Sequence, residues 1–347
     1  MTMNLLRYYL RKVFTVLRNE VLVLPSRIVV LLFFLSMLLI PLVVDDPYFI
    51  RILVLTSIFA IFAASWDLLS GFTGQINFGH ALFFGVGAYG SAIMNQHGLP
   101  HWATIPLGAL VAVAAGLVVG VPCLRLRGTY LALTTLAFPI ILLGIVFAFP
   151  GLTGGELGIS GLTRLSTSRT VTYYIVVVIM LLSCAAMWKI TDSKIGIIFH
   201  AIREDELAVK AAGINTTLYK LLAFCLSGFF AGIAGGLYAH FMRIAGPSTL
   251  EVQMSFQVVI YSVFGGIATI WGPVGAVFIL VPLMEFFRLW PEFRTLMFAF
   301  VVILILLYMP GGLLPWIRNK VEEECPRCKI RNLVTRRVCR VCAADMR

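Results

Sequence analysis

The chain has 347 residues, of which 60% are hydrophobic and only 12% charged, and its formal net charge is +11. Soluble domains carry about 25% charged residues, so this composition and a mean hydropathy of +0.96 exclude an ordinary soluble protein. The positive charge does not indicate nucleic-acid binding, because the Lys and Arg residues lie between and beyond long apolar runs. The sequence therefore predicts an integral membrane protein whose cations set its orientation.

The first segment, residues 1–27, has the pattern of an amphipathic helix. Arg7, Arg11 and Arg18 fall on one face and apolar side chains cover the other, which predicts a helix lying in the cytoplasmic headgroup region. We do not expect a cleaved signal peptide, because the next apolar run ends at Pro41 without a small-residue cleavage site.

Residues 28–317 contain apolar stretches that can cross a bilayer, which takes about 20 residues each. The expected fold is all-α, a polytopic transmembrane helix bundle of eight to ten spans that includes broken or re-entrant helices. Placing both termini in the cytoplasm puts all but six of the 27 Lys and Arg residues inside. Two of the spans, 78–96 and 273–290, could instead be half helices. The candidate spans are 28–44, 50–70, 78–96, 102–122, 129–149, 171–190, 218–242, 253–271, 273–290 and 294–312.

A glycine-rich, polar stretch from Gly71 to Tyr89 interrupts the apolar pattern. Irregular backbone at membrane depth is tolerated only where protein or a water-filled cavity satisfies its polar groups. Broken helices near the midplane form solute paths in transporters. We therefore expect a substrate pathway here; His80 could contact solute or hold the break closed. The candidate pathway residues in this stretch are Thr73, Gln75, Asn77, Gly79 and His80.

Two further features bear on this pathway. A second interruption at 264–275 hints at inverted repeats with a site between them. The glycine-rich loop 151–161 is predicted outside, where Thr153, Gly154 and Gly155 either face solute or belong to a flexible connection. Asp67 lies near a helix end and is expected to be solvated; if buried, it would need a partner.

Residues 192–217 form a predicted cytoplasmic segment that can dock onto a partner. Arg203 to Ala212 is expected to be a single helix, since its residues are good helix formers and Glu206 and Lys210 are spaced i,i+4. Gly213 occupies the position where a helix C′ residue turns left-handed. The alternative is a solvated helix that binds nothing. The candidate docking residues are Arg203, Glu204, Asp205, Glu206, Ala212 and Gly213.

The basic tail, residues 318–347, contains two close cysteine pairs with the spacing C-x2-C-x10-C-x2-C. Such pairs can supply the four thiolates of a structural Zn²⁺ site. The metal ligands would be Cys325, Cys328, Cys339 and Cys342. Iron in a rubredoxin-like site, or free thiols in a disordered tail, are the alternatives. We expect a zinc-ribbon-like structure that the metal itself stabilises.

The sequence shows no chemistry of an enzyme. It contains no Gly-Lys dipeptide and hence no phosphate-binding loop. No Ser-His-Asp series and no metalloprotease motif is visible. If ATP drives this protein, separate subunits must hydrolyse it.

Taken together, three motifs resemble the permease subunits of branched-chain amino-acid ABC importers, the Liv type. They are the stretch Gly71–Tyr89, the sequence Leu152-Thr153-Gly154-Gly155, and Ala201-Ile202-Arg203-Glu204-Asp205-Glu206 followed by Ala212-Gly213-Ile214. The resemblance covers about residues 28–317. It implies half of a translocation pathway that works by alternating access in a prokaryotic inner membrane.

The resemblance also implies partners: a homologous second permease, two cytoplasmic ATPases that pull on residues 192–217, and an extracytoplasmic solute-binding protein. Asp67 and Asn77 depart from the family, which often has Asn and Ser at these positions. A permease for urea or short amides therefore stays open, as do an ion-coupled secondary transporter and a non-transport membrane scaffold.

Overall fold

The computed structural model describes residues 36–41, 46–124, 126, 128–290 and parts of 292–345. The chain divides into two compact units, one of residues Asp46–Gly312 and one of Met1–Asp45 with Leu313–Arg347. The predicted interfacial helix 1–27 lies outside the described residues. So do most of the predicted span 28–44 and nine of the 19 residues of the predicted span 294–312.

Among the described residues of the larger unit, the regular structure is helical apart from one small pair of strands. The antiparallel pair joins Ile159 to Ala245 and Ser160 to Ile244. Its elements, in chain order, are α3 (Pro47–Trp66), a π-helical turn (Asp67–Gly71), α4 (Ala81–Gln96), α5 (His101–Cys123), α6 (Thr129–Ala148), α7 (Pro150–Thr153), a 3-10 turn (Gly155–Leu157), β1 (Ile159–Ser160), α8 (Arg169–Thr191), α9 (Lys194–Glu204), α10 (Glu206–Ala211), α11 (Thr216–Met242), β2 (Ile244–Ala245), a 3-10 turn (Pro247–Leu250), α12 (Val252–Gly265), α13 (Trp271–Phe286) and a 3-10 turn (Phe287–Leu289).

Six helices within the described residues are long and apolar enough to cross a membrane, which confirms the all-α polytopic bundle. The helix of the uncertain span 78–96 is short, since α4 has 16 residues. The full span expected at 253–271 is wrong, because α12 ends after 14 residues where Gly266 turns to φ +110°. The other uncertain span is long enough: α13 and the turn after it cover 19 residues, Trp271–Leu289.

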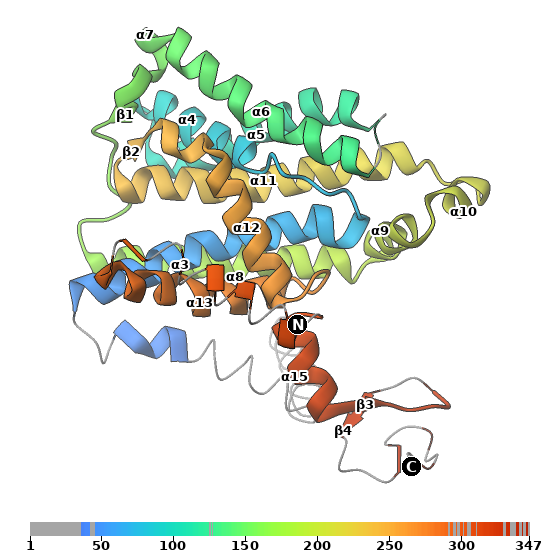
Figure 1. Cartoon of the computed structure of the whole chain (residues 1–347). Coiled ribbons are helices and arrows are strands. Elements are labelled where there is room, and N and C mark those ends of the chain that lie inside the picture. The colour runs from blue at the N-terminus through green and yellow to red at the C-terminus, as the bar shows by residue number, and fades with distance from the viewer. Residues whose placement is uncertain are drawn as a thin grey trace, which may run out of the picture. The chain divides into compact units, whose positions relative to one another are not determined.

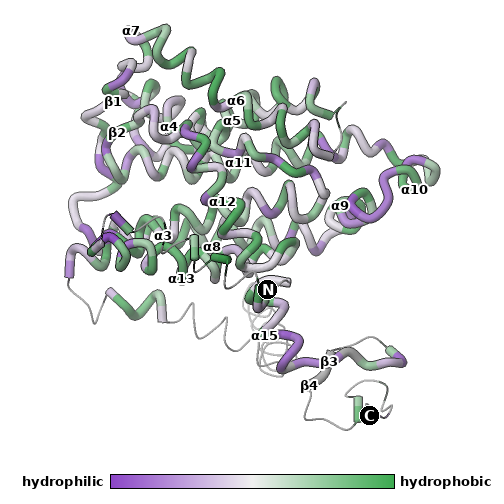
Figure 2. Tube along the Cα trace, in the orientation of Figure 1, coloured by the Kyte–Doolittle hydropathy of each residue, from purple (hydrophilic) through white to green (hydrophobic). Residues whose placement is uncertain are grey.

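The helices of this unit pack in two groups that α3 and α11 connect. In one group α11 packs against α4 and α5, and in the other α3 packs against α8 and α13 (Figure 1). Figure 2 shows that the long helices are apolar along most of their length, whereas α9 and α10 mix hydrophilic and apolar residues. Close contact between α4, α5 and α11 depends on small residues. A Cβ atom on Gly87 of α4 would lie 2.4 Å from the carbonyl oxygen of Gly232 on α11.

The helix α3 is enclosed by protein although it is as apolar as a lipid-facing span. In its most apolar stretch 83% of the residues are buried, against 28% in α6. Asp46 caps its start by accepting a hydrogen bond from the Tyr48 N–H, and Pro47 occupies its first turn. The exposed apolar side chains of α6 therefore have to contact lipid or another subunit, while α3 forms the centre of the bundle.

In the smaller unit the tail forms one helix and a short hairpin. α15 (Leu313–Val321) leads into β3 (Glu322–Glu324), which pairs antiparallel with β4 (Arg331–Leu333). Cys325 directly follows β3, and Cys328 lies in the turn after it. The hairpin thereby presents the first cysteine pair of the predicted metal site.

Candidate functional site

The break predicted after residue 71 is present, and its residues 75–77 form hydrogen bonds with Trp66 of α3 and with Ser70. The indole N–H of Trp66 donates to the Asn77 carbonyl oxygen at 2.6 Å. The Ser70 hydroxyl donates to the Gln75 carbonyl oxygen at 3.0 Å and accepts from the Asn77 N–H at 3.2 Å. Side chains of α3 and of the π-helical turn after it thus satisfy backbone groups that the broken helix leaves open, as membrane depth requires.

The candidate pathway side chains of this break are buried in the conformation observed. The Thr73 hydroxyl donates to the Leu69 carbonyl oxygen at 2.6 Å, and Asn77 accepts from the Gly79 N–H at 2.8 Å. His80 is fully buried, forms a 2.9 Å hydrogen bond with Ser65 and stacks on Phe62. These side chains hold the break in shape.

Gln75 differs from its neighbours in the break. Its Oε1 atom is buried, and no hydrogen-bond partner for it lies within the described part of the chain. Leaving a buried acceptor unpaired costs about 1–3 kcal/mol. Gln75 is therefore the pathway candidate with unused hydrogen-bonding capacity.

The break also packs tightly against α6. A Cβ atom on Gly79 would lie 1.9 Å from the Thr135 carbonyl oxygen, and the Phe78 N–H donates to the Thr135 hydroxyl at 3.1 Å. Glycine at position 79 is therefore needed for close approach of the two backbones.

Asp67 joins this break to the second one, which corrects the expectation that it is solvated. Its carboxylate is fully buried and accepts three backbone N–H groups: Ala268 at 2.7 Å, Thr269 at 2.9 Å and Ile270 at 3.0 Å. Ala268 and Ile270 both have positive φ, 62° and 49°, which non-glycine residues rarely adopt. The partner that a buried Asp67 needs is thus the backbone of the loop between α12 and α13, some 200 residues away.

In the loop 151–161, which is predicted to lie outside, the candidate residues bond locally. The Thr153 hydroxyl hydrogen-bonds the carbonyl oxygens of Val146, at 2.7 Å, and Phe149, at 2.9 Å. Gly154 ends α7 in the left-handed conformation, φ +73°, and the Gly155 N–H donates to Thr153. Within the described part of the chain, the hydrogen bonds of the Thr153 hydroxyl stay within α6 and this loop and do not reach the break at 71–80.

The single helix expected from Arg203 to Ala212 is wrong, because Asp205 divides it. Asp205 has extended backbone and its carboxylate accepts from the N–H groups of Leu207 and Ala208, so it ends α9 and caps α10. The left-handed Gly213 is confirmed, with φ +82°. An aspartate preceding Glu-Leu-Ala is a local N-cap signal that could have located the division.

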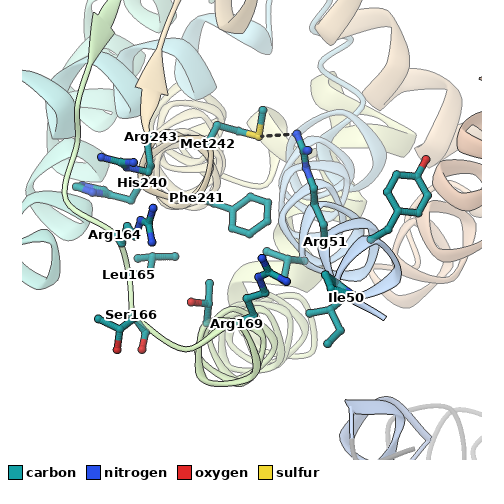
Figure 3. Close-up of a pocket in the computed structure, with 15 residues that line it drawn as sticks. Ile50, Arg51, Arg164, Leu165, Ser166, Arg169, His240, Phe241, Met242 and Arg243 are labelled. Atoms are coloured by element: carbon teal, nitrogen blue, oxygen red, sulfur yellow. Dashed lines mark hydrogen bonds between the residues drawn. The ribbon is translucent and has the colours of Figure 1, made fainter. Parts of the chain in front are cut away.

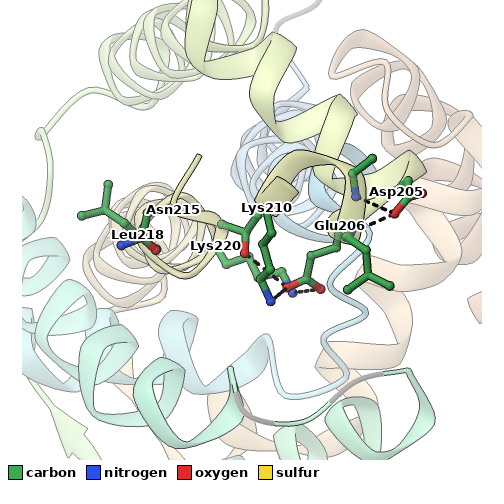
Figure 4. Close-up of polar contacts among 9 residues, drawn as sticks. Asp205, Glu206, Lys210, Asn215, Leu218 and Lys220 are labelled. Atoms are coloured by element: carbon green, nitrogen blue, oxygen red, sulfur yellow. Dashed lines mark hydrogen bonds and ion pairs between the residues drawn. The ribbon is translucent and has the colours of Figure 1, made fainter. Parts of the chain in front are cut away.

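Glu206 is the centre of an ion cluster that fixes α10 onto α11 (Figure 4). Its carboxylate lies 2.8 Å from Lys210 Nζ and 2.6 Å from Lys220 Nζ, and Lys220 is almost fully buried. Burial raises the pKa of Glu206, but hydrogen bonds and charges from Lys210 and Lys220 outweigh it and lower the pKa to about 2. The i,i+4 pair with Lys210 was expected; the pair with Lys220 was not.

The rest of this segment leaves an open surface that is linked to the break. Arg203, Glu204, Leu207 and Ala212 are exposed, Leu207 to 65%. The Arg203 guanidinium also donates to the Gly71 carbonyl oxygen at 2.6 Å. The predicted docking segment therefore directly contacts the π-helical turn that follows α3.

The four tail cysteines come together as their spacing predicts. Their Sγ atoms all lie within 4.8 Å of one another. The closest pairs are Cys325 with Cys342 and Cys328 with Cys339, each at 3.5 Å. A tetrahedral thiolate site with Zn–S bonds of about 2.3 Å needs sulfur–sulfur distances of about 3.8 Å. The cluster fits a four-coordinate metal.

An apolar bundle that encloses two broken helices is typical of the membrane domain of a solute transporter. The chain belongs to the family of permease components of the branched-chain amino acid transport system, whose model matches residues 48–309. It is a multi-pass membrane permease subunit.

Individual relatives agree with this assignment. The chain is 30% identical to the high-affinity branched-chain amino acid transport permease protein LivM of Salmonella typhimurium, over 81% of this chain and 73% of LivM. The identity to LivM of Escherichia coli is also 30%, over 79% and 71%. The permease protein LivH of Salmonella typhimurium is 24% identical, over 78% and 94%. No solved structure matched the chain.

Proposed function

We propose that this chain is one permease subunit of an ATP-driven importer of branched-chain or related hydrophobic amino acids. The observation that supports this most directly is the exposed segment α9–α10, whose Arg203 hydrogen-bonds the Gly71 carbonyl oxygen at the end of the π-helical turn that follows α3. A partner that moves this segment moves the break of the central helix. The chain forms half of a pathway that alternates between outward and inward openings.

The proposed partners supply the functions for which this sequence has no motif. The sequence has no phosphate-binding loop, so two cytoplasmic ABC ATPases hydrolyse the ATP and dock on α9–α10. Both LivM and LivH resemble this chain, which supports a homologous second permease in a heterodimer. A solute-binding protein delivers to the opposite face. Both termini lie in the cytoplasm of a prokaryotic cell.

The pathway residues are the polar groups of the break together with the outer loop. In the observed conformation Thr73, Asn77 and His80 are buried, so they reach solute only when the break is displaced. Within the break, Gln75 is the strongest candidate to contact solute, because its buried oxygen lacks a partner among the described residues. Thr153, Gly154 and Gly155 shape the outer entrance.

Docking on α10 is tested at Leu207. We expect Leu207→Asp to lower solute-stimulated ATP hydrolysis and uptake by about tenfold or more in the assembled transporter. The Asp carboxylate would replace an exposed apolar side chain and would be left unpaired in the interface with the ATPase. Stimulated hydrolysis and uptake of labelled leucine are measured in proteoliposomes. Leu207 is a cleaner choice than Arg203 or Asp205, which have bonds within the chain.

The conservative variant Leu207→Met is the matched control and should keep both activities. Full coupling in Leu207→Asp would contradict docking on α10. Uptake by the purified chain without ATPases would instead favour an ion-coupled secondary transporter. Unimpaired uptake after deletion of the subunit would favour a scaffold.

The tail holds one structural Zn²⁺ on its four cysteines. We expect about one zinc per chain in freshly purified, reduced protein and little in Cys339→Ser. Four sulfur ligands leave no open position, so the metal stabilises the hairpin and takes no part in catalysis. Elemental analysis measures the metal, and limited proteolysis with and without chelator measures the fold of the tail.

The matched control is Cys184→Ser, since Cys184 is a buried thiol of α8 outside the cluster. Its zinc content should equal that of the parent protein. If the analysis finds one iron per chain in place of zinc, the four cysteines form a rubredoxin-like iron site. A metal-free tail that proteases cleave equally fast with and without chelator would overturn the metal site.

A further inference from the structure

A pocket of about 600 Å³ lies at the ends of α3, α8 and α11 that are opposite to the segment α9–α10 (Figure 3). Its walls come from the first turns of α3 and α8, the loop before α8 and the last turn of α11. Small-molecule sites typically have volumes of about 300–1,000 Å³. If α9–α10 is cytoplasmic, this pocket opens on the outer side, where solute enters.

Four arginines line this pocket, and no Asp or Glu is among its lining residues. Arg51 contacts the Met242 sulfur at 4.0 Å, and Arg243 donates to the Leu162 carbonyl oxygen at 3.3 Å. Within the part of the chain that the structure describes, no carboxylate pairs with Arg51, Arg164, Arg169 or Arg243. Four guanidinium groups without carboxylate partners around one cavity favour the binding of an anion there.

Arg243 is held in an unusual conformation at this pocket. It caps α11 with φ +60°, a position where helices usually have glycine. Non-glycine residues in this region carry strain, which clusters at ligand sites. The neighbouring His240 is already occupied, because it hydrogen-bonds Ser91, Thr104 and the Thr163 carbonyl oxygen.

The same pocket also has apolar walls. Val54 and Leu165 are buried beneath it, and Ile50 and Phe241 line it as well. A ligand that satisfies both kinds of wall has a carboxylate for the guanidinium forks and an aliphatic body for the apolar side chains.

We propose that this pocket binds the carboxylate end of an aliphatic solute as it enters the transporter. Arg164 and Arg169 are its principal charged ligands, because both are exposed and neither guanidinium group has a hydrogen bond or ion pair within the described residues. The inference rests on the proposed function, and it places the first solute contact at the arginines rather than at the break.

The test uses 4-methylpentanoate, which has the aliphatic body and carboxylate of leucine without its ammonium group. The full chain is placed in nanodiscs of zwitterionic lipid, and binding is measured by saturation-transfer NMR. We expect saturable binding that is weakened about tenfold or more in Arg164→Gln/Arg169→Gln. The neutral isostere 4-methylpentanamide should bind the parent protein as weakly as 4-methylpentanoate binds the double variant.

Arg288→Gln is the matched control, since Arg288 is exposed but pairs with Glu285 and does not line the pocket. It should bind the carboxylate like the parent protein. Equal binding by the parent and the double variant, or by acid and amide, would overturn the proposal. So would loss of carboxylate binding when phosphatidylglycerol is added to the nanodiscs, because lipid phosphate would then occupy the arginines.

A third contrary outcome concerns the binding protein. If the double variant binds the carboxylate normally but loses affinity for the solute-binding protein, the arginines contact acidic groups of that protein instead. These measurements need neither ATPase nor uptake. The pocket proposal can therefore be overturned while ATP-driven leucine uptake supports the proposed transporter. Conversely, carboxylate binding can be observed while ATP-driven uptake is absent.

Discussion

Replacing Asp67 by asparagine is expected to lower the melting temperature of the protein sharply and to reduce its folded yield. The carboxylate accepts with both oxygens, Oδ1 from Ala268 and Oδ2 from Thr269 and Ile270. An asparagine can place its single oxygen at one of these positions only. Its NH₂ group then faces an N–H donor in a fully buried site, and each buried donor left unpaired costs about 1–3 kcal/mol.

The loss should exceed a single hydrogen bond, because Asp67 also stabilises the positive φ angles of Ala268 and Ile270. Without the carboxylate nothing in that contact favours the strained loop, and residues in such conformations cost about 1–3 kcal/mol each. We therefore expect the loop between α12 and α13 to rearrange and uptake to fall with it. Thermal melting in detergent, followed by size-exclusion chromatography, measures the stability.

The control for this variant is Asp192→Asn, which makes the same chemical change at an exposed aspartate after α8. It should melt within the error of the parent protein, since surface substitutions are usually within about 0.5 kcal/mol. If Asp67→Asn and Asp192→Asn melt alike, the carboxylate does not hold the two breaks together.

The second large effect is expected at Glu206. In Glu206→Gln the amine of Lys220, which is 2% exposed, loses its carboxylate partner and stays buried. Removing one member of a buried pair typically costs about 3–5 kcal/mol. Here the loss should approach the lower figure, because the Glu206 side chain is 18% exposed and water reaches it.

The double variant Glu206→Gln/Lys220→Met should recover most of the lost stability, because it removes the unpaired charge as well. The interaction energy of the two changes, obtained from a double-mutant cycle, isolates the pair. Glu204→Gln, at an exposed neighbour, is the control for the charge change alone. Equal melting of Glu204→Gln and Glu206→Gln would rule out a stabilising role of the pair.

The same ion cluster predicts a pH dependence. The folded-state pKa of Glu206, about 2, lies below its ordinary value of 4.5. A carboxyl group with a depressed pKa stabilises the fold fully above its unfolded-state pKa, and this contribution is lost as the pH falls toward 2. The difference in melting temperature between the parent protein and Glu206→Gln should therefore shrink as the pH falls from about 5 toward 2.

The sequence by itself determined the features that depend on short-range patterns. Runs of apolar residues predicted helices, glycines at 71–79 predicted the break, and Gly213 predicted a left-handed helix end. The spacing of Cys325 to Cys342 predicted the thiolate cluster. The division of α9 from α10 is also encoded locally. The Asp205 side chain caps α10, and this capping outweighs the helix propensity of residues 203–212.

Only the tertiary structure decided how these parts are joined. Asp67 bonds to backbone N–H groups, and Lys220 to a carboxylate 14 positions earlier across a helix boundary. The four arginines that line the 600 Å³ pocket come from segments nearly 200 residues apart. Every non-proline residue has the same backbone donor, and the sequence of a charged residue and its neighbours does not indicate with which distant residue it pairs. Such long-range pairings depend on which segments the packed helices bring together, and that information does not reside in any local window of the sequence.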